Sequence, residues 1–292
     1  MSPKITIGIS FKNPGNYFKL ALQSIFAQTF KDWELILIDD GSSDDSLMVA
    51  AKSLKDSRVR VHSDGESRGL NIRLNQLVQL AKAPYFLRMD ADDVMHPQRL
   101  EKQYQALLQY DENTVIGAAA YSIDADSQVV GLRPICTQQK SGFAARHSFI
   151  HPTVAASTEW FRRHPYSENF VFQRSQDAEL WCRTAAYTKF VNLSEPLLYY
   201  RESGTFSFKN YIGTSLGLIH IIYIYNSNRR FSFLYFFLLQ LIKLSIAGVT
   251  ECFKVSNLLV VMRYQTLHSS ELQIAIKALS IVKKQSLPLN DS

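Results

Sequence analysis

Short apolar segments that end abruptly in acidic residues constrain the fold of this chain more than any other feature. The segment ELILIDD runs from apolar residues straight into Asp39 and Asp40, and the segment YFLRMDADD ends in Asp90, Asp92 and Asp93. Short, almost uniformly apolar strands are typical of a parallel sheet that is covered on both faces. Ligands of such sheets collect beyond the carboxyl ends of the strands, where both acidic clusters are expected to lie.

The segments between these strands predict helices. Apolar residues that alternate along the chain, or recur at helical spacing, predict strands near residues 5–10, 34–40, 58–62 and 85–89, and helices before residue 29, over 70–82 and over 97–110. The cluster NPGN ends the first strand, and a proline begins the last of these helices. This alternation of strands and helices predicts an α/β fold.

Asp90 and Asp92 have the spacing of two carboxylates that bind a divalent cation. A hard cation such as Mg²⁺ or Mn²⁺ takes oxygen ligands and usually receives only one or two carboxylates from the protein, with water and phosphate oxygens completing its shell. Such a cation would neutralise a diphosphate leaving group. A helix cap explains the same turn, because Asp92 or Asp93 precedes Pro97. The spacing alone leaves both interpretations open.

Four stretches of the chain, in order and spacing, resemble the family 2 glycosyltransferases with the GT-A fold, of the kind that assembles bacterial polysaccharides. They are QSIFAQTFKDWELILIDDGSSDDS, GLNIRLNQLVQLAKAPYFLRMDADDVMHPQRLEKQ, HPTV and QDAELWCR. The resemblance runs from about residue 5 to residue 201. It implies a Rossmann-like mixed sheet flanked by helices, as in nucleotide-diphospho-sugar transferases, over residues 1–205. A helical, hydrophobic C-terminal extension is expected over residues 206–292.

The resemblance also implies an activity and its residues. It implies an inverting, metal-dependent glycosyltransferase that moves a sugar from a nucleotide-sugar donor, a UDP-sugar being expected, to a hydroxyl of a glycan acceptor. That acceptor is expected to be lipid-linked, in the synthesis of a cell-surface polysaccharide such as O-antigen, capsule or exopolysaccharide. Asp177 matches the general base, and Asp92 and Asp90 match the DxD motif that holds Mn²⁺ or Mg²⁺. Asp40 matches the residue that reads the nucleotide base, and Asp39 is expected to organise the loop beside it.

Three further residues are candidates with weaker support. Arg88, directly before the DxD motif, is expected at the donor, although a surface charge at a strand end explains it equally well. His151 is expected near the acceptor or the diphosphate, but a histidine before proline more often has a structural role. Asp93 is expected to cap the following helix.

The chain also departs from the family pattern. Gln176 stands where a glutamate usually precedes the base, Ser67 replaces an asparagine, and the stretch ESGTFS lacks a histidine that many relatives have. These departures leave a noncatalytic nucleotide-sugar-binding or scaffolding relative as the alternative. A nucleotidyltransferase or a Rossmann dehydrogenase is disfavoured, because SFKNPGNYF contains only Gly15 where those classes need a glycine-rich loop.

The positive charge of the chain lies in its last third. Residues 200–292 contain 10 Lys and Arg against 4 Asp and Glu, so they carry the whole net charge of +6. The most apolar stretch is residues 231–249, but Gln240 and Lys243 interrupt it, and a spanning helix needs about 20 nearly uncharged residues. We therefore expect an interfacial helix on an anionic membrane surface, with packing on the protein or on a second copy of it, and spanning, as the alternatives.

The expected compartment is the cytoplasm. The first residues, MSPKITIGIS, lack the basic and apolar regions of a secretory signal, and the three cysteines form no CxxC pair. Together with the apolar stretch, this predicts a peripheral protein on the cytoplasmic face of the plasma or inner membrane. A homo-oligomer is an open expectation, and no nucleic-acid partner is expected.

Overall fold

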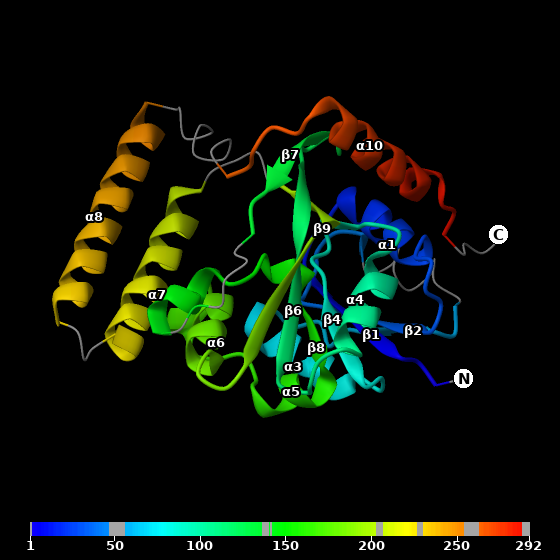
Figure 1. The fold of residues 1–292 in the computed structure, drawn as a ribbon, viewed down its shortest axis with the longest axis horizontal. Coiled ribbons are helices and arrows are strands. Elements are labelled where there is room, and N and C mark those ends of the chain that lie inside the picture. The colour runs from blue at the N-terminus through cyan, green and yellow to red at the C-terminus, as the bar shows by residue number, and fades with distance from the viewer. Residues whose placement is uncertain are drawn as a thin grey trace.

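The chain folds around one mixed sheet with helices on both faces (Figure 1). The computed structural model describes residues 2–46, 56–135, 140, 142–202, 207–226, 230–253 and 263–287. Among these residues, nine strands form the sheet in the order β3-β2-β1-β4-β8-β6-β9-β5, and β7 pairs with β6. The predicted α/β class and mixed sheet are therefore confirmed.

The longest elements, strand β9 and helices α7, α8 and α10, lie in the second half of the chain. The strands are β1 (Ile5–Phe11), β2 (Trp33–Asp39), β3 (Val59–His62), β4 (Tyr85–Arg88), β5 (Val94–Met95), β6 (Thr114–Ile123), β7 (Val129–Arg133), β8 (Ala155–Ser157) and β9 (Lys189–Arg201). The helices are α1 (Tyr17–Phe26), α3 (Leu70–Leu80), α4 (Arg99–Leu107), α5 (Thr158–Arg163), α6 (Gln176–Thr184), α7 (Phe208–Asn226), α8 (Arg230–Cys252) and α10 (Ser269–Lys284). The described residues also include short 3₁₀ helices, η1 (Gly142–His147), η2 (His151–Thr153) and η3 (Phe170–Phe172).

Strands β1 to β4 form the parallel half of the sheet. β1 lies between β2 and β4, and β2 pairs with β3, all in parallel. Successive side chains of β2 point to opposite faces. Leu35 and Leu37 pack in the core under α1 and α4, whereas Ile36 and Ile38 pack under α3. Because parallel strands share one carboxyl edge, the turns after β2 and β4 open on the same side of the sheet.

The second half of the sheet is mixed. The short strand β8 runs antiparallel to both β4 and β6, and β6 runs parallel to β9 along most of its length. The end of β9 also pairs with β5, directly after the acidic turn. These pairings bring residues 94–95 and 198–201 to the same edge as the carboxyl end of β4.

One expectation about this edge was wrong. Asp93 does not cap the next helix: the residue at the helix start is Gln98, and α4 begins two residues later than predicted. Asp93 is buried and instead accepts the backbone N–H of Arg201 at 2.8 Å. The physical reason is that Val94 and Met95 form strand β5, which separates the acidic turn from the helix.

The last third of the chain contains an apolar helical hairpin and a returning helix. α7 and α8 form a hairpin at one end of the molecule, and α10 lies at the other end near α1 and β7 (Figure 1). The Tyr199 hydroxyl donates a hydrogen bond of 2.8 Å to the backbone oxygen of Ala275 in α10. Phe233–Cys252 is long and apolar enough to cross a membrane, with a mean hydropathy of 1.8 and 11% of its residues buried. The hydrophobic helical extension is confirmed, while the division at residue 205 stays a prediction.

Candidate active site

Asp39 and Asp40 at the end of β2 both hold neighbouring loops. The Asp40 carboxylate accepts the backbone N–H groups of Arg68 and Gly69 at 2.7 and 3.0 Å. The Asp39 carboxylate accepts the N–H of Ser42 at 2.9 Å. Both side chains are buried. The loop-organising role that we expected for Asp39 is therefore shared by Asp40, whose oxygens already have several partners.

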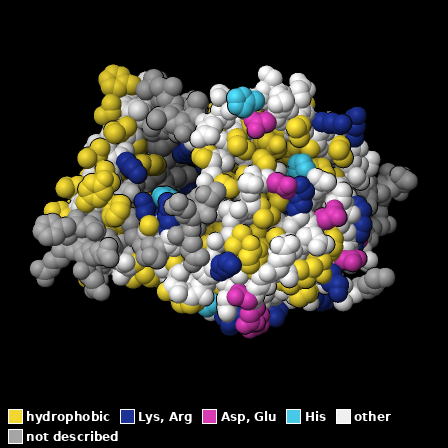
Figure 2. Space-filling model, viewed as in Figure 1, with side chains coloured by type: hydrophobic (Ala, Val, Ile, Leu, Met, Phe, Trp, Pro, Cys, Tyr) yellow, Lys and Arg dark blue, Asp and Glu magenta, His cyan; other side chains and the backbone are white. Residues whose placement is uncertain are grey.

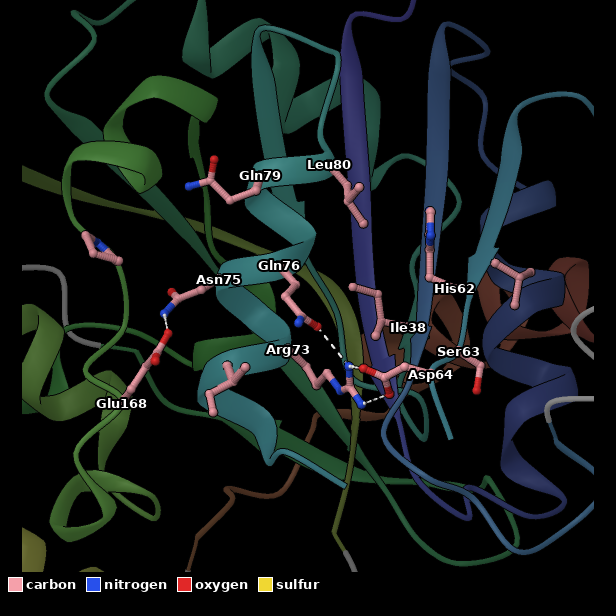
Figure 3. Close-up of a pocket in the computed structure, with 13 residues that line it drawn as sticks. Ile38, His62, Ser63, Asp64, Arg73, Asn75, Gln76, Gln79, Leu80 and Glu168 are labelled. Carbon is pink, nitrogen blue, oxygen red and sulfur yellow. Dashed lines mark hydrogen bonds and ion pairs between the residues drawn. The ribbon is translucent and has the colours of Figure 1, made fainter. Parts of the chain in front are cut away.

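Arg73 on α3 is a buried cation that the sequence analysis did not single out. Its side chain is 2% exposed, and its Nε donates to Asp40 at 2.9 Å. Its two terminal nitrogens donate to Asp64 at 3.1 and 2.7 Å, and Nη1 also donates to Gln76 (Figure 3). Hydrogen bonds from Arg73 hold the pKa of the Asp64 carboxyl well below its usual range. This network fixes the loop between β3 and α3 against the end of β2.

A cavity of about 830 Å³ lies beside this network, between α3, β3 and the loop that contains Glu168 (Figure 3). His62, Gln76 and Gln79 line it, and Asn75 crosses to Glu168 with a hydrogen bond of 3.0 Å. Neither Asp90 nor Asp177 lines this cavity. It therefore lies apart from the residues that were predicted to do chemistry.

A second cavity, of about 430 Å³, brings together residues from three separate sequence motifs. Arg88 and Asp90 enter it from the end of β4, His151 enters from η2, and Asp177 enters from the first turn of α6. Four predicted site residues therefore share one cavity. The remaining three do not line it: Asp39, Asp40 and Asp92.

Arg88 lies at the centre of this cavity's charged groups. Its guanidinium is 2% exposed and forms an ion pair with Asp90, whose side chain is 33% exposed. Among the described residues, its Nε and Nη1 have no hydrogen-bond partner. The backbone oxygen of Arg88 accepts from Arg99, which is itself fully buried. The alternative interpretation of Arg88 as a surface charge at a strand end is wrong, because its side chain is buried against the cavity.

Asp177 meets the first geometric requirement of a general base, because its carboxylate faces a cavity. It lies in the first turn of α6, and one carboxylate oxygen accepts the N–H of Ala178 at 2.8 Å. Burial raises the pKa of the Asp177 carboxyl, and the positive charge of Arg88 opposes that rise. Glu179 and Arg183 of the same helix form an i, i+4 ion pair at 2.8 Å that does not involve Asp177.

His151 is held by an aromatic partner. Its Nε2 lies 2.9 Å from the Tyr166 hydroxyl, and the two rings are 5.5 Å apart. Burial, helped by the positive charge of Arg88, lowers the pKa of His151 well below its usual value. The imidazole is therefore neutral near pH 7. Trp181 is fully buried in the core beside this pair.

The residues of the acidic turn fit a hard divalent cation. Burial and the negative charge of Asp90 raise the pKa of Asp92, and burial with both neighbouring charges raises the pKa of Asp93. Crowded carboxylates of this kind are relieved when a cation binds between them. Among the residues that the structure describes, no three metal-ligating side chains are grouped, so water and substrate oxygens would have to complete the shell.

Sequence reasoning missed several residues that shape the site. Arg73 lay inside a quoted family stretch but carried no distinguishing signal of its own. Tyr166, Arg133 and Arg174 come from the region between the recognised motifs, where the sequence offered little to interpret. The fold brings the last two to the same cavity as Asp177.

Comparison with known proteins agrees with this geometry. The chain is 32% identical to the O-antigen biosynthesis glycosyltransferase WbnJ of Escherichia coli over 63% of this chain and 74% of WbnJ. It is 28% identical to EpsE of Bacillus subtilis over 78% of this chain and 83% of that protein. Its fold is similar to that of S. aureus TarS 1–349 in complex with UDP, with a TM-score of 0.61 and 15% identity over 96% of this chain and 80% of TarS 1–349.

The family model for glycosyl transferase family 2 matches residues 6–187, which include the acidic turn, the histidine of η2 and the first turns of α6. The mixed sheet flanked by helices is the GT-A fold that the sequence predicted. The chain belongs to glycosyl transferase family 2 and is a glycosyltransferase.

Proposed function

We propose that the protein transfers a sugar from a UDP-sugar to a hydroxyl of a glycan acceptor with inversion at the anomeric carbon. The observation that carries this proposal is that Asp90, Arg88 and Asp177 line one cavity. A donor diphosphate held near Asp90 and an acceptor hydroxyl near Asp177 would then share this cavity, as a direct displacement requires. General bases act within hydrogen-bond reach of the proton they remove.

The proposed step is one displacement. The acceptor oxygen forms a bond to the anomeric carbon while the bond from that carbon to the diphosphate oxygen breaks. The acceptor proton passes to the Asp177 carboxylate, and the electron pair of the broken bond leaves with the nucleoside diphosphate. Arg88 keeps a positive charge beside Asp177, which favours the ionised form that can accept a proton.

Asp90 and Asp92 are the proposed ligands of Mn²⁺ or Mg²⁺, with Asp92 the more direct one. When bound, such a cation supplies positive charge that stabilises the leaving diphosphate. Asp93 and Arg201 hold the turn in place: Arg201 donates its N–H to Asp93 and its Nε to the backbone oxygen of Asp92, both at 2.8 Å. His151 is the proposed neutral neighbour of the substrate in this cavity.

The donor base is proposed to bind near Asp40. The TarS structures include complexes with UDP and with UDP-GlcNAc, which supports a uridine donor for a chain of the same fold. Because the Asp40 oxygens already accept from Arg68, Gly69 and Arg73, uracil would have to share them. Asp39 is proposed to shape the pocket through its loop.

The proposed setting is cell-surface polysaccharide assembly at the cytoplasmic face of the membrane. The similarity to WbnJ supports a polysaccharide, and the exposed apolar surface of α8 supports an interfacial helix beside a lipid-linked acceptor. An anionic membrane surface is the proposed partner of the basic last third of the chain.

Calorimetry with UDP, GDP and dTDP, each with and without Mn²⁺, tests the proposal. We expect UDP to bind only with metal, and Asp92→Ala to lose that binding while keeping its melting temperature. Asp126→Ala is the matched control, because Asp126 is exposed and lies in another acidic turn. Binding of UDP that is unchanged by Asp92→Ala would overturn the metal assignment. Failure of every nucleotide to bind would favour the noncatalytic alternative.

A further inference from the structure

The cavity that contains Asp177 is basic on the side away from the nucleotide half of the sheet. Arg133 from the end of β7, His147 from η1 and Arg174 from the residues before α6 all line it. The Arg133 guanidinium lies 4.0 Å above the ring of Tyr200 and 3.7 Å from Glu202. Arg174 is exposed, and its side chain forms no ion pair with any described residue. We call these three residues the basic rim.

Further cations lie around this rim. Partial burial and the positive charges of Arg146, Lys243 and Lys140 lower the pKa of His147 to about 4, so its imidazole is neutral near pH 7 and Arg133 and Arg174 carry the charge of the rim. Lys243 belongs to α8, so the cation that interrupts the apolar stretch acts on the rim. Figure 2 shows Lys, Arg and His side chains gathered between the apolar outer surface of α8 and the rest of the molecule. The positive field is therefore concentrated where the cavity meets the hairpin.

Arg88 gives a second, independent sign of a missing ligand. The Arg88 side chain is only 2% exposed, yet its Nε and Nη1 have no hydrogen-bond partner among the described residues. Buried polar atoms are nearly always satisfied in native proteins, and an exception calls for an unseen partner. An anion in this cavity would satisfy donors from Arg88 and charges from the rim at once.

The basic rim is joined to the apolar hairpin. The Thr214 hydroxyl of α7 donates to the backbone oxygen of Arg174. Gly217 of α7 packs so closely that a Cβ there would lie 2.1 Å from the Ser175 hydroxyl, two residues before Asp177. Arg146 lies over the ring of Phe236 in α8 at 5.5 Å. These contacts pack the segment that carries the rim directly against the hairpin.

We propose that the basic rim of Arg133, His147 and Arg174 binds a phosphate group of the acceptor, so that the acceptor substrate is a phosphate-bearing glycan. This inference rests on the proposed function and names its acceptor class. Two sources share that chemistry: the phosphate through which a glycan is linked to a lipid, and a phosphate within the glycan itself. Guanidinium groups suit both, because they donate paired hydrogen bonds to phosphate oxygens.

The rim shares its cavity with Asp90 but comes from different elements than the residues proposed for the nucleotide. Its three residues come from β7, η1 and the loop before α6, and none comes from the β1, β2 and β3 edge that carries Asp39 and Asp40. Asp177, which must face the acceptor hydroxyl, lies three residues after Arg174 in the first turn of α6. This proximity to the proposed base is why we assign a phosphate on the rim to the acceptor, and the test below fills the donor site first to separate the two.

The test uses protein that is already saturated with UDP and Mg²⁺, so that the donor diphosphate site is filled. Calorimetry then follows binding of inorganic phosphate, of dodecyl phosphate below its micelle concentration, and of uncharged dodecyl maltoside. The variant is Arg133→Gln with Arg174→Gln. The matched control is Arg162→Gln with Arg163→Gln, which removes two arginines that lie outside the cavity and pair with the exposed Glu159 and Glu112. Arg162 also donates to the backbone oxygen of Ala81 at 2.9 Å, so the melting temperature of this control is measured as well.

We expect dodecyl phosphate to bind the UDP-loaded protein and the rim variant to bind it at least about tenfold more weakly, because charged hydrogen bonds are lost. UDP binding and the control should stay unchanged. Tighter binding of dodecyl phosphate than of inorganic phosphate would assign a lipid-linked source, and equal binding would assign a phosphate within the glycan.

Equal binding of dodecyl phosphate by the rim variant, or no binding by UDP-loaded wild type, would overturn the phosphate site while leaving the proposed function intact. A rim variant that loses UDP affinity would also overturn it, because the arginines would then serve the donor. If UDP fails to bind wild type, the proposed function fails first. The same phosphate titrations on ligand-free protein then decide the rim separately.

Discussion

The two acidic ends of the parallel strands differ in how completely their polar atoms are paired. After β2, the buried carboxylates of Asp39 and Asp40 accept from backbone N–H groups, serine hydroxyls and Arg73. After β4, Arg88 has two guanidinium nitrogens without a partner among the described residues, and Asp93 has one such carboxylate oxygen. The carboxylates after β2 therefore have hydrogen-bond partners without any ligand, whereas the polar groups after β4 still lack some.

This difference separates scaffold from reaction site. A fully paired buried network rigidifies its surroundings, whereas an unpaired buried charge costs stability until a partner arrives. The end after β2 therefore keeps its loops in one shape. The end after β4, together with Asp177, leaves polar groups available to the proposed substrate and metal. Variants at the first end should change stability, and variants at the second should change turnover.

Asp177→Asn should give the largest effect of these variants, a fall in the turnover rate. Loss of a general base typically costs about 10² to 10⁴ in rate. We expect UDP release from the donor to fall by that factor while calorimetric UDP binding stays the same. Retention of full activity would remove Asp177 as the base and break the contrast between the two ends.

The same variant should be more stable than wild type at neutral pH. Burial raises the pKa of Asp177, so its contribution to stability is full below the unfolded-state pKa of about 4 and is lost as pH rises through the folded-state pKa. Asn cannot ionise and avoids that loss. The melting temperature of the variant should exceed that of wild type at pH 7, and the difference should shrink toward pH 4. A lower melting temperature at pH 7 would contradict this.

Arg73→Gln should give the second largest effect, a loss of stability. Arg73 is buried between Asp40 and Asp64, and removal of one partner from a buried ion pair costs about 3–5 kcal/mol. The exposure of Asp64 places the expected loss in unfolding free energy near the lower end, about 3 kcal/mol. Denaturant unfolding measures it.

Arg68→Gln is the matched control for Arg73. Arg68 pairs with Asp64 and Glu66, but its side chain is 43% exposed, so its loss should cost less than about 1 kcal/mol. If both variants lose the same unfolding free energy, burial does not make the Arg73 network more important for stability than the exposed Arg68 pairs.

The sequence predicted the fold and the acidic edge because both depend on local patterns. Short apolar runs and turn residues predict strands and their ends, and parallel strands then bring Asp40 and Asp90 to one edge. The helix cap assigned to Asp93 was wrong, since β5 forms only when β9 returns from 100 residues later along the chain. Pairing over such a distance leaves no signal in the turn itself.

The acceptor side of the site could not be predicted in the same way. Arg133 and Arg174 lie in stretches without a recognisable pattern, and only the fold places them beside Asp177. A lone arginine in a sequence is usually a solvated surface charge. Its partners, or their absence, become visible only when the long-range packing of η1, β7 and α6 is known.

Substitutions in α8 should change stability least, because the apolar side chains on its outer face are exposed to solvent. Leu238, Ile242 and Ile246 are 48%, 55% and 50% exposed and recur every four residues, so they share one face of the helix. Changing all three to Gln should alter the unfolding free energy by less than about 0.5 kcal/mol per site, because exposed side chains contribute little to folding. Binding to vesicles of phosphatidylcholine and phosphatidylglycerol, measured by sedimentation, should be lost.

The matched control changes three exposed isoleucines of α10, Ile274, Ile276 and Ile281, to Gln. It should retain vesicle binding, because α10 lies at the other end of the molecule from the hairpin (Figure 1). If the α8 variant still binds vesicles, the apolar face of α8 is not the membrane contact. If wild type is a dimer that the α8 variant dissociates, that face packs on a second copy of the chain and not on lipid.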